Sequence, residues 1–103
     1  MGEEEILEAL VKLDAKYGDR FSFASFRCNI LDALNHAKEH RLGWTLFYLN
    51  EAYEELTKLV DEGIPDEANA VGLAVIYVTL KKCAEAFEGS WLEKTAREVF
   101  GST

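Results

Sequence analysis

The residues best suited to chemistry in this chain are two histidines and two acids within one short stretch. His36 and His40 are four positions apart, with Glu39 beside them and Asp32 four positions before His36. In a helix, side chains four positions apart lie on the same face, so both imidazoles and the Asp32 carboxylate could bind one metal ion. Glu39 would be close enough to act as a general base on a metal-bound water. These four residues are the candidate metal site.

The order of residues 36–40, His-x-x-Glu-His, matches the zinc-binding signature of the inverzincin peptidases. In those much larger enzymes the third ligand is a glutamate far downstream, and 103 residues are too few to supply it at that separation. A helical wheel also places Asp32 and His36 opposite Phe26, as in a solvated outer face. A metal-binding protein or metal-dependent hydrolase is therefore the alternative interpretation, and we expect no cofactor.

No other group of residues has the spacing of a catalytic site. Cys28 and Cys83 are far apart and match no paired motif. The acidic cluster of Glu51, Glu54 and Glu55 lacks the Glu-x-x-His pattern of a di-metal carboxylate site and falls on the polar side of its helix. The chain contains no glycine-rich phosphate loop. The residues therefore favour a protein that is not an enzyme, although they do not decide the question.

Composition and charge restrict the partners. The net charge is −8, and the eleven basic residues are scattered, which argues against direct binding of a nucleic acid. No apolar run approaches the roughly 20 residues that a membrane-spanning helix needs. The start, Met-Gly-Glu-Glu-Glu, lacks the basic region of a signal peptide. We expect an acidic, cytoplasmic protein with reduced thiols and no contact with a membrane.

Apolar residues recur every three or four positions along most of the chain, which predicts an all-α fold. We expect a compact bundle of about five helices that forms a single helical domain over residues 1–103. An α+β fold is the alternative, because the segments 44–49 and 71–80 could also be extended strands. Turn signals such as Asn-Gly, which a sheet would need around those segments, do not occur.

The first two helices have recognisable starts and ends. The first should begin at the three glutamates of positions 3–5 and end with Gly18 in the left-handed conformation. Ser22 should cap the second helix, and Gly43 should stop it. A single helix that continues through Gly43 is the alternative.

The third helix should begin near Trp44 or Thr45 and end at Gly63, with Ile64 folding back onto Leu59. Its apolar residues share one face, which we expect to be buried: Leu46, Leu49, Ala52, Tyr53, Leu56, Leu59 and Val60. Glutamates and a lysine occupy the opposite face.

The fourth helix contains the most informative stretch, because the sequence from Ala68 to Leu80 has no charged residue. Its aliphatic side chains would lie on every side of the helix: Val71, Leu73, Val75, Ile76, Val78 and Leu80. A helix that is apolar all round must be enclosed, either by the other helices or by a second copy of the chain. We therefore place this helix at the centre of the bundle, ending at Gly89, before a short fifth helix between Ser90 and Gly101.

The leading functional hypothesis is a non-catalytic protein–protein interaction module, a small subunit or adaptor that forms a homodimer. Its candidate interface combines aromatic residues of the third helix with valines of the fourth: Trp44, Phe47, Val71, Val75 and Val78. Trp44 and Phe47 either fill the corner next to the second helix or anchor a partner. The acidic surface around them would suit a basic partner. A small helical subunit of a nucleoprotein complex is a further alternative.

Overall fold

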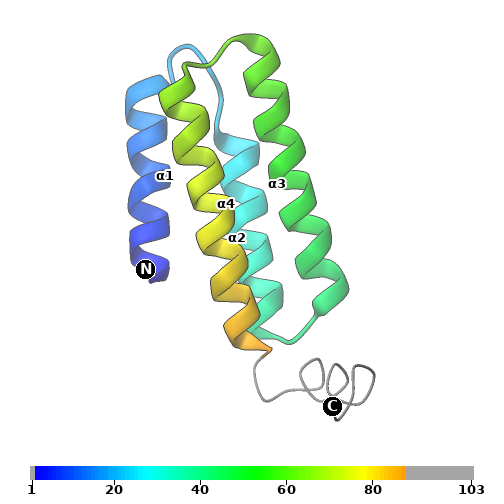
Figure 1. The fold of residues 1–103 in the computed structure, drawn as a ribbon. Coiled ribbons are helices and arrows are strands. Elements are labelled where there is room, and N and C mark those ends of the chain that lie inside the picture. The colour runs from blue at the N-terminus through cyan, green and yellow to red at the C-terminus, as the bar shows by residue number, and fades with distance from the viewer. Residues whose placement is uncertain (1, 88–103) are drawn as a thin grey trace, which may run out of the picture.

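The structure, a computed structural model, describes residues 2–87, which form four helices joined by short connections (Figure 1). The helices are α1 (Glu3–Tyr17), α2 (Ala24–Lys38), α3 (Leu42–Glu62) and α4 (Asp66–Ala86). No strand occurs among the described residues. The all-α class is therefore confirmed, and the α+β alternative is wrong, because the segments 44–49 and 71–80 lie within α3 and α4.

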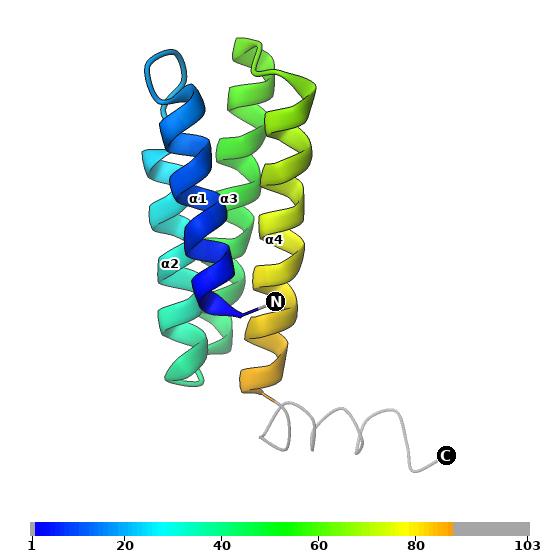
Figure 2. The same ribbon diagram turned by 90° about the vertical axis from the view of Figure 1, so that its left-hand side faces the viewer.

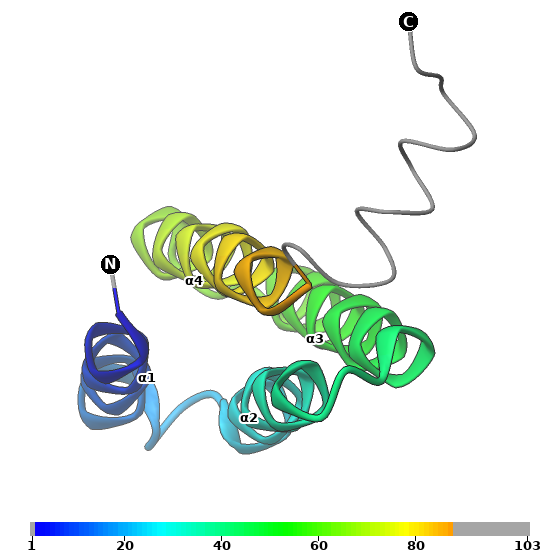
Figure 3. The same ribbon diagram turned by 90° about the horizontal axis from the view of Figure 1, so that it is seen from below.

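The number of helices in the described part of the chain is four, which corrects the expectation of about five. The fifth helix, predicted between Ser90 and Gly101, lies outside the described residues, and so does Gly89, the predicted end of the fourth. Successive helices alternate in direction (Figures 1 and 2). Viewed along the bundle, α4 lies across from α1 and α2, with α3 beside α2 (Figure 3). α4 contacts each of the other three helices, which gives it a central position.

The corner between α2 and α3 differs from the prediction. α2 ends at Lys38, and Gly43 lies inside α3 instead of stopping α2. His40 makes the turn in its place, with a φ of 58° in the left-handed region. The amides of His40 and Arg41 donate to carbonyls of the last turn of α2 at 3.0 and 2.9 Å, the paired bonds of a Schellman cap. The sequence does not predict this turn, because the usual signal for a left-handed helix end is glycine and not histidine.

The end of α3 is the one that the sequence predicts. Gly63 is left-handed, with a φ of 100°, and its amide donates to the carbonyl of Val60 at 3.0 Å. The amide of Ile64 donates to the carbonyl of Leu59 at 3.1 Å, and the Ile64 side chain is buried. This second Schellman cap reverses the chain into α4 directly after Pro65.

The beginning of the chain follows the prediction less closely. Gly18 ends α1, but in the right-handed conformation (φ −57°, ψ −27°), so the expected left-handed role is wrong. The hydroxyl of Ser22 accepts a hydrogen bond from the amide of Ala24 at 3.4 Å, yet the residue at the cap position is Phe23. The buried ring of Phe23 anchors the entry of the chain into α2.

One apolar core runs between the four helices. Each helix contributes buried members in turn, among them Ile6, Leu10, Leu13, Tyr17, Phe26, Ile30, Leu34, Leu49, Leu56, Leu59 and Val75. Two threonines are also buried, and the hydroxyls of Thr45 and Thr79 donate to backbone carbonyls one turn earlier at 2.8 and 2.6 Å. Within residues 2–87 no buried side-chain nitrogen or oxygen lacks a hydrogen-bond partner, as a stable core requires.

The enclosure of α4 is incomplete. Val75 and Cys83 face the core, but Leu73, Tyr77 and Leu80 remain exposed. Of the two expected ways of enclosing this helix, the first, by the other helices, covers only part of it in the described part of the chain, and the second, by another copy, stays a prediction. None of the four helices is both long and apolar enough to span a bilayer.

Candidate interaction surfaces

Four aromatic rings meet at the outer edge between α2 and α3, and we call them the aromatic cluster. The imidazole of His36, on α2, stacks on the rings of Trp44 and Tyr48 on α3, at centroid distances of 5.8 and 5.3 Å. Phe47 meets Trp44 and Tyr48 edge-on, at 5.8 and 5.2 Å. Ring faces and ring edges carry opposite partial charges, so these offset and edge-on arrangements hold the rings in place.

The two largest apolar members of the aromatic cluster remain half in solvent. Trp44 is 54% exposed and Phe47 is 49% exposed, whereas His36 and Tyr48 are half-buried. Trp44 thus contacts α2 across the corner and still presents much of its ring to solvent. Because the neighbouring rings restrict its rotation, a partner that covers Trp44 would lose little conformational entropy.

Acidic side chains lie beside the aromatic cluster on α3. Glu51 and Glu54 follow Phe47 by four and seven residues, so the three share one side of the helix. Neither glutamate forms an ion pair with another described residue. Glu39, by contrast, pairs with Arg41 at 2.6 Å. Lys58 interacts with the charges of Glu51 and Glu54, but it forms its ion pair with Glu55 at 3.2 Å, so three glutamates share one lysine and a net negative charge borders the exposed rings.

A second apolar surface lies on the outward side of α3 and α4, where the sequence predicted core. Leu46, Tyr53 and Val60 were expected in the buried stripe of the third helix, but all three are exposed. We call this surface the α3/α4 face. Its six residues are between 43% and 61% exposed: Leu46, Tyr53, Val60, Leu73, Tyr77 and Leu80.

The residues of the α3/α4 face flank the seam between the two helices. Seven-residue spacings place Leu46, Tyr53 and Val60 in one row, turned away from Tyr48, which contacts α2. On α4, Val71 marks the side that faces α1, because it lines a groove together with residues of α1. Leu80 follows Val71 by nine residues and therefore lies on the opposite side of the helix. Sequence reasoning assigned the α3 row to the core because an apolar stripe does not reveal how much of its width the neighbouring helix covers.

The five residues predicted for an interface do not form one surface. Trp44 and Phe47 belong to the aromatic cluster. Val75 is buried in the core of the chain itself, where no partner can reach it. Val71 and Val78 are partly buried against the core. Of the five residues, Trp44 and Phe47 are therefore the most exposed.

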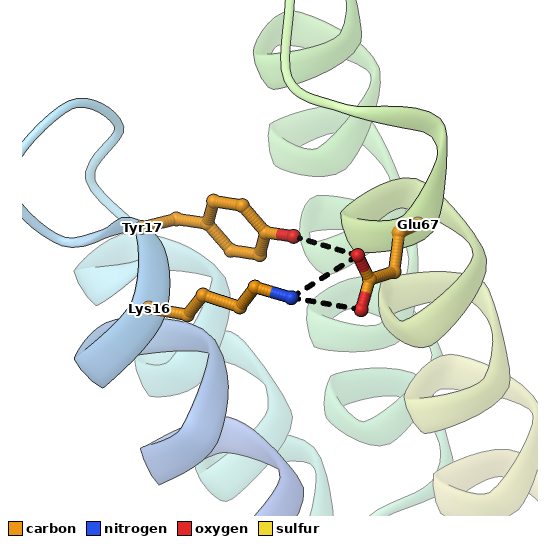
Figure 4. A network of polar contacts seen from close by, with 3 residues as sticks. All are labelled: Lys16, Tyr17 and Glu67. Atoms are coloured by element: carbon orange, nitrogen blue, oxygen red, sulfur yellow. Dashed lines mark hydrogen bonds and ion pairs between the residues drawn. The ribbon is translucent and has the colours of Figure 1, made fainter.

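Val71 also lines a groove of about 720 Å³ between α1 and α4. Ala9 and Leu13 form its apolar floor, and charged residues form its rim. At one end, Lys16 donates to both carboxylate oxygens of Glu67 at 3.0 and 3.1 Å (Figure 4). The hydroxyl of Tyr17 donates to the same carboxylate at 3.3 Å.

The contacts of this carboxylate fix its charge state. The hydrogen bonds from Lys16, then its positive charge, and the bond from Tyr17 lower the pKa of Glu67. Glu67, through its hydrogen bonds and its negative charge, and Tyr17 raise the pKa of Lys16. Both shifts favour the charged forms of the two groups at neutral pH, so neither group is well suited to exchange a proton with a substrate. The network links α1 to α4 and has the character of a structural ion pair.

The candidate metal residues are not arranged as the sequence analysis assumed. α2 ends at Lys38, so Glu39 and His40 lie beyond the helix, and His40 is turned into the left-handed region. The ring of His40 meets Phe87 edge-on at 6.0 Å, whereas His36 belongs to the aromatic cluster. Asp32, on α2, is half-buried. The prediction that His36 and His40 lie on one face of the same helix is thus wrong.

Within residues 2–87, no three His, Cys, Asp or Glu side chains are grouped so that they could hold a metal ion. Metal binding by the pair of histidines stays a prediction, which a zinc titration of the protein and of its His36→Ala, His40→Ala variant would test.

The two thiols differ in exposure. Cys28 is exposed on α2, and Cys83 is buried, with its Sγ 3.8 Å from the carbonyl oxygen of Ala33. Burial raises the pKa of Cys83 to about 11. A thiol with so high a pKa is inert at neutral pH, because the thiolate is the reactive form.

Compared with models of protein families, with curated proteins and with solved structures, the chain matches none of them at a significant level.

Proposed function

We propose that this protein is a non-catalytic interaction module, an adaptor or small subunit that binds a partner protein and self-associates. The observation that carries the proposal is the half-exposed pair of Trp44 and Phe47, held by ring contacts from two helices. Tryptophan and other aromatic residues supply much of the binding energy in protein interfaces. No mobile segment has to be ordered before these two rings can be covered.

The charges around the rings indicate the chemistry of the partner. Glu51 and Glu54 lie on the same side of α3 as Phe47, and neither forms an ion pair with another described residue, because Lys58 pairs with Glu55. A partner segment that places an apolar side chain against the rings and lysine or arginine beside it would match this surface. Such an interaction should weaken as the salt concentration rises.

The test is affinity purification of the tagged full-length chain from its native cells, with quantitative mass spectrometry. We expect at least one protein that the wild type retains and the Trp44→Ser, Phe47→Ser variant loses. Val11→Ser is the matched control, because Val11 is also an exposed apolar residue but lies on α1. Circular dichroism must show that both variants keep their helices. An identical set of captured proteins for the wild type and the aromatic variant would contradict the proposal.

A further inference from the structure

We infer that the α3/α4 face is the surface through which two copies of this chain associate. This inference rests on the self-associating part of the proposed function and assigns a surface to it that differs from the aromatic cluster. The six residues that define the face come from both helices of one hairpin and are all large and apolar.

The first argument concerns the absence of charge from the face. Between the apolar residues of the α3 row stand Asn50 and Thr57, and the neighbouring positions of α4 carry small or apolar residues such as Ala70 and Ile76. The nearest charged group on α4 is Lys81, whose ammonium lies 5.6 Å from the centroid of the Tyr77 ring at the border. An uncharged strip of this length is unusual on a chain of net charge −8.

A second copy fits this strip better than another partner does. Two copies of an acidic chain repel each other wherever their charged surfaces meet, so an uncharged face is where close contact is least unfavourable. A basic partner would find carboxylates at the edge of the strip, where Glu54 accepts a hydrogen bond from Asn50 at 3.4 Å, and beside the aromatic cluster, but none among the six residues of the face itself. An anionic membrane would repel the chain as a whole.

The second argument concerns the spacing along the two helices. On α3 the residues of the face and those between them recur at alternating steps of four and three: Leu46, Asn50, Tyr53, Thr57 and Val60. On α4, Leu73, Tyr77 and Leu80 continue the same alternation. This spacing lets side chains of one helix fit between those of a facing helix. A two-fold axis that lies in the plane of the interface, parallel to the helices, would place α3 of each copy opposite α4 of the other.

The third argument is the size of the face. From Leu46 to Val60 the face is about 21 Å long, and two adjacent helices are about 20 Å wide, so it offers about 400 Å² in projection. The accessible surface of such a face exceeds its projection, because side chains stand out from it. Specific interfaces typically bury about 800 Å² per partner. The projected area of the face is about half of that value, which corresponds to a small interface of modest affinity.

The test is sedimentation velocity of the full-length chain over a range of concentrations. We expect a monomer–dimer equilibrium with a dissociation constant on the order of 10 μM, the affinity of a modest interface. The Asn50→Glu, Thr57→Glu variant should weaken association by at least about tenfold, because it buries unpaired charges against the apolar α4 row of the other copy. Both positions are exposed, so the fold should tolerate the change. The Tyr53→Lys, Leu80→Lys variant should weaken association as well, because it replaces two apolar residues of the face with positive charges.

The control variant is Val11→Lys, which introduces a charge at an exposed apolar position on α1, outside both the face and the aromatic cluster, and should leave the dimer intact. A wild type that is monomeric at all concentrations would overturn the inference, even if Trp44 and Phe47 still capture a partner. A dimer that the control dissociates, and the face variants do not, would refute the assigned surface and leave self-association standing. Dimerisation only after deletion of residues 88–103 would identify that segment as the occupant and would also refute the inference.

Discussion

The Cδ1 atom of Leu56 on α3 lies only 2.7 Å from the point where a β-carbon would stand at Gly72 on α4. No larger residue fits there without displacing Leu56, whose side chain is buried in the core. The missing side chain of Gly72 therefore lets the two helices approach closely. The same approach aligns the two rows of the α3/α4 face along one seam.

Gly72→Ala should destabilise the protein. Overpacking a core costs about 1–3 kcal/mol, and the better helix propensity of alanine offsets up to about 1 kcal/mol of that, so we expect a net loss of about 1–2 kcal/mol. Gly43→Ala is the matched control, because Gly43 is also helical but has no atom within 4 Å of the added carbon. The control should gain up to about 1 kcal/mol. Urea denaturation measures both, and equal effects of the two substitutions would contradict the close packing at Gly72.

The left-handed conformation of His40 predicts an unusual order of stabilities. A β-carbon in this region costs about 1 kcal/mol, which glycine avoids. His40→Gly and His40→Ala both lose the ring contact with Phe87. The difference in stability between the two variants therefore measures the cost of a β-carbon in the left-handed conformation. We expect the glycine variant to be more stable by about 1 kcal/mol in thermal or urea denaturation. A more stable alanine variant would show that α2 continues through this position.

The two thiols should differ in reactivity in the native protein. With Ellman's reagent at neutral pH, Cys28 should react quickly, because it is exposed. Cys83 should react only as the protein unfolds, because it is buried and its pKa is raised to about 11. Cys28→Ser should remove the fast phase and Cys83→Ala the slow one. Rapid reaction of both thiols under native conditions would be inconsistent with the packing of α4 on α2.

The raised pKa of Cys83 also predicts a pH dependence of stability. The unfolded thiol ionises near its ordinary value of 9.0, whereas the folded thiol keeps its proton until about pH 11. Between these values the native state binds more protons than the unfolded state, so the free energy of unfolding falls as the pH rises. Cys83→Ala should show a smaller fall over this range than the wild type. Parallel curves for the two proteins would refute the raised pKa.

Much of the fold was determined by the sequence alone, because local interactions suffice for it. The three-and-four spacing of apolar residues specifies helices, and Gly63 followed by Ile64 specifies the end of α3 through two backbone hydrogen bonds. The turn at His40 could not be predicted in this way. Its left-handed backbone is imposed by the packing of α2 against α3 and not by the preference of histidine.

Which apolar residues would be buried was decided only by the tertiary structure. Leu49 and Tyr53 lie on the same broad stripe of α3, yet one is in the core and the other is exposed, because the neighbouring helices cover only part of that stripe. On α4 the same geometry separates Val75 from Leu73 and Leu80. The periodicity of the sequence shows on which side of its helix a residue lies. Whether that side is buried depends on which neighbouring helix covers it, and only the packing of the four helices decides this.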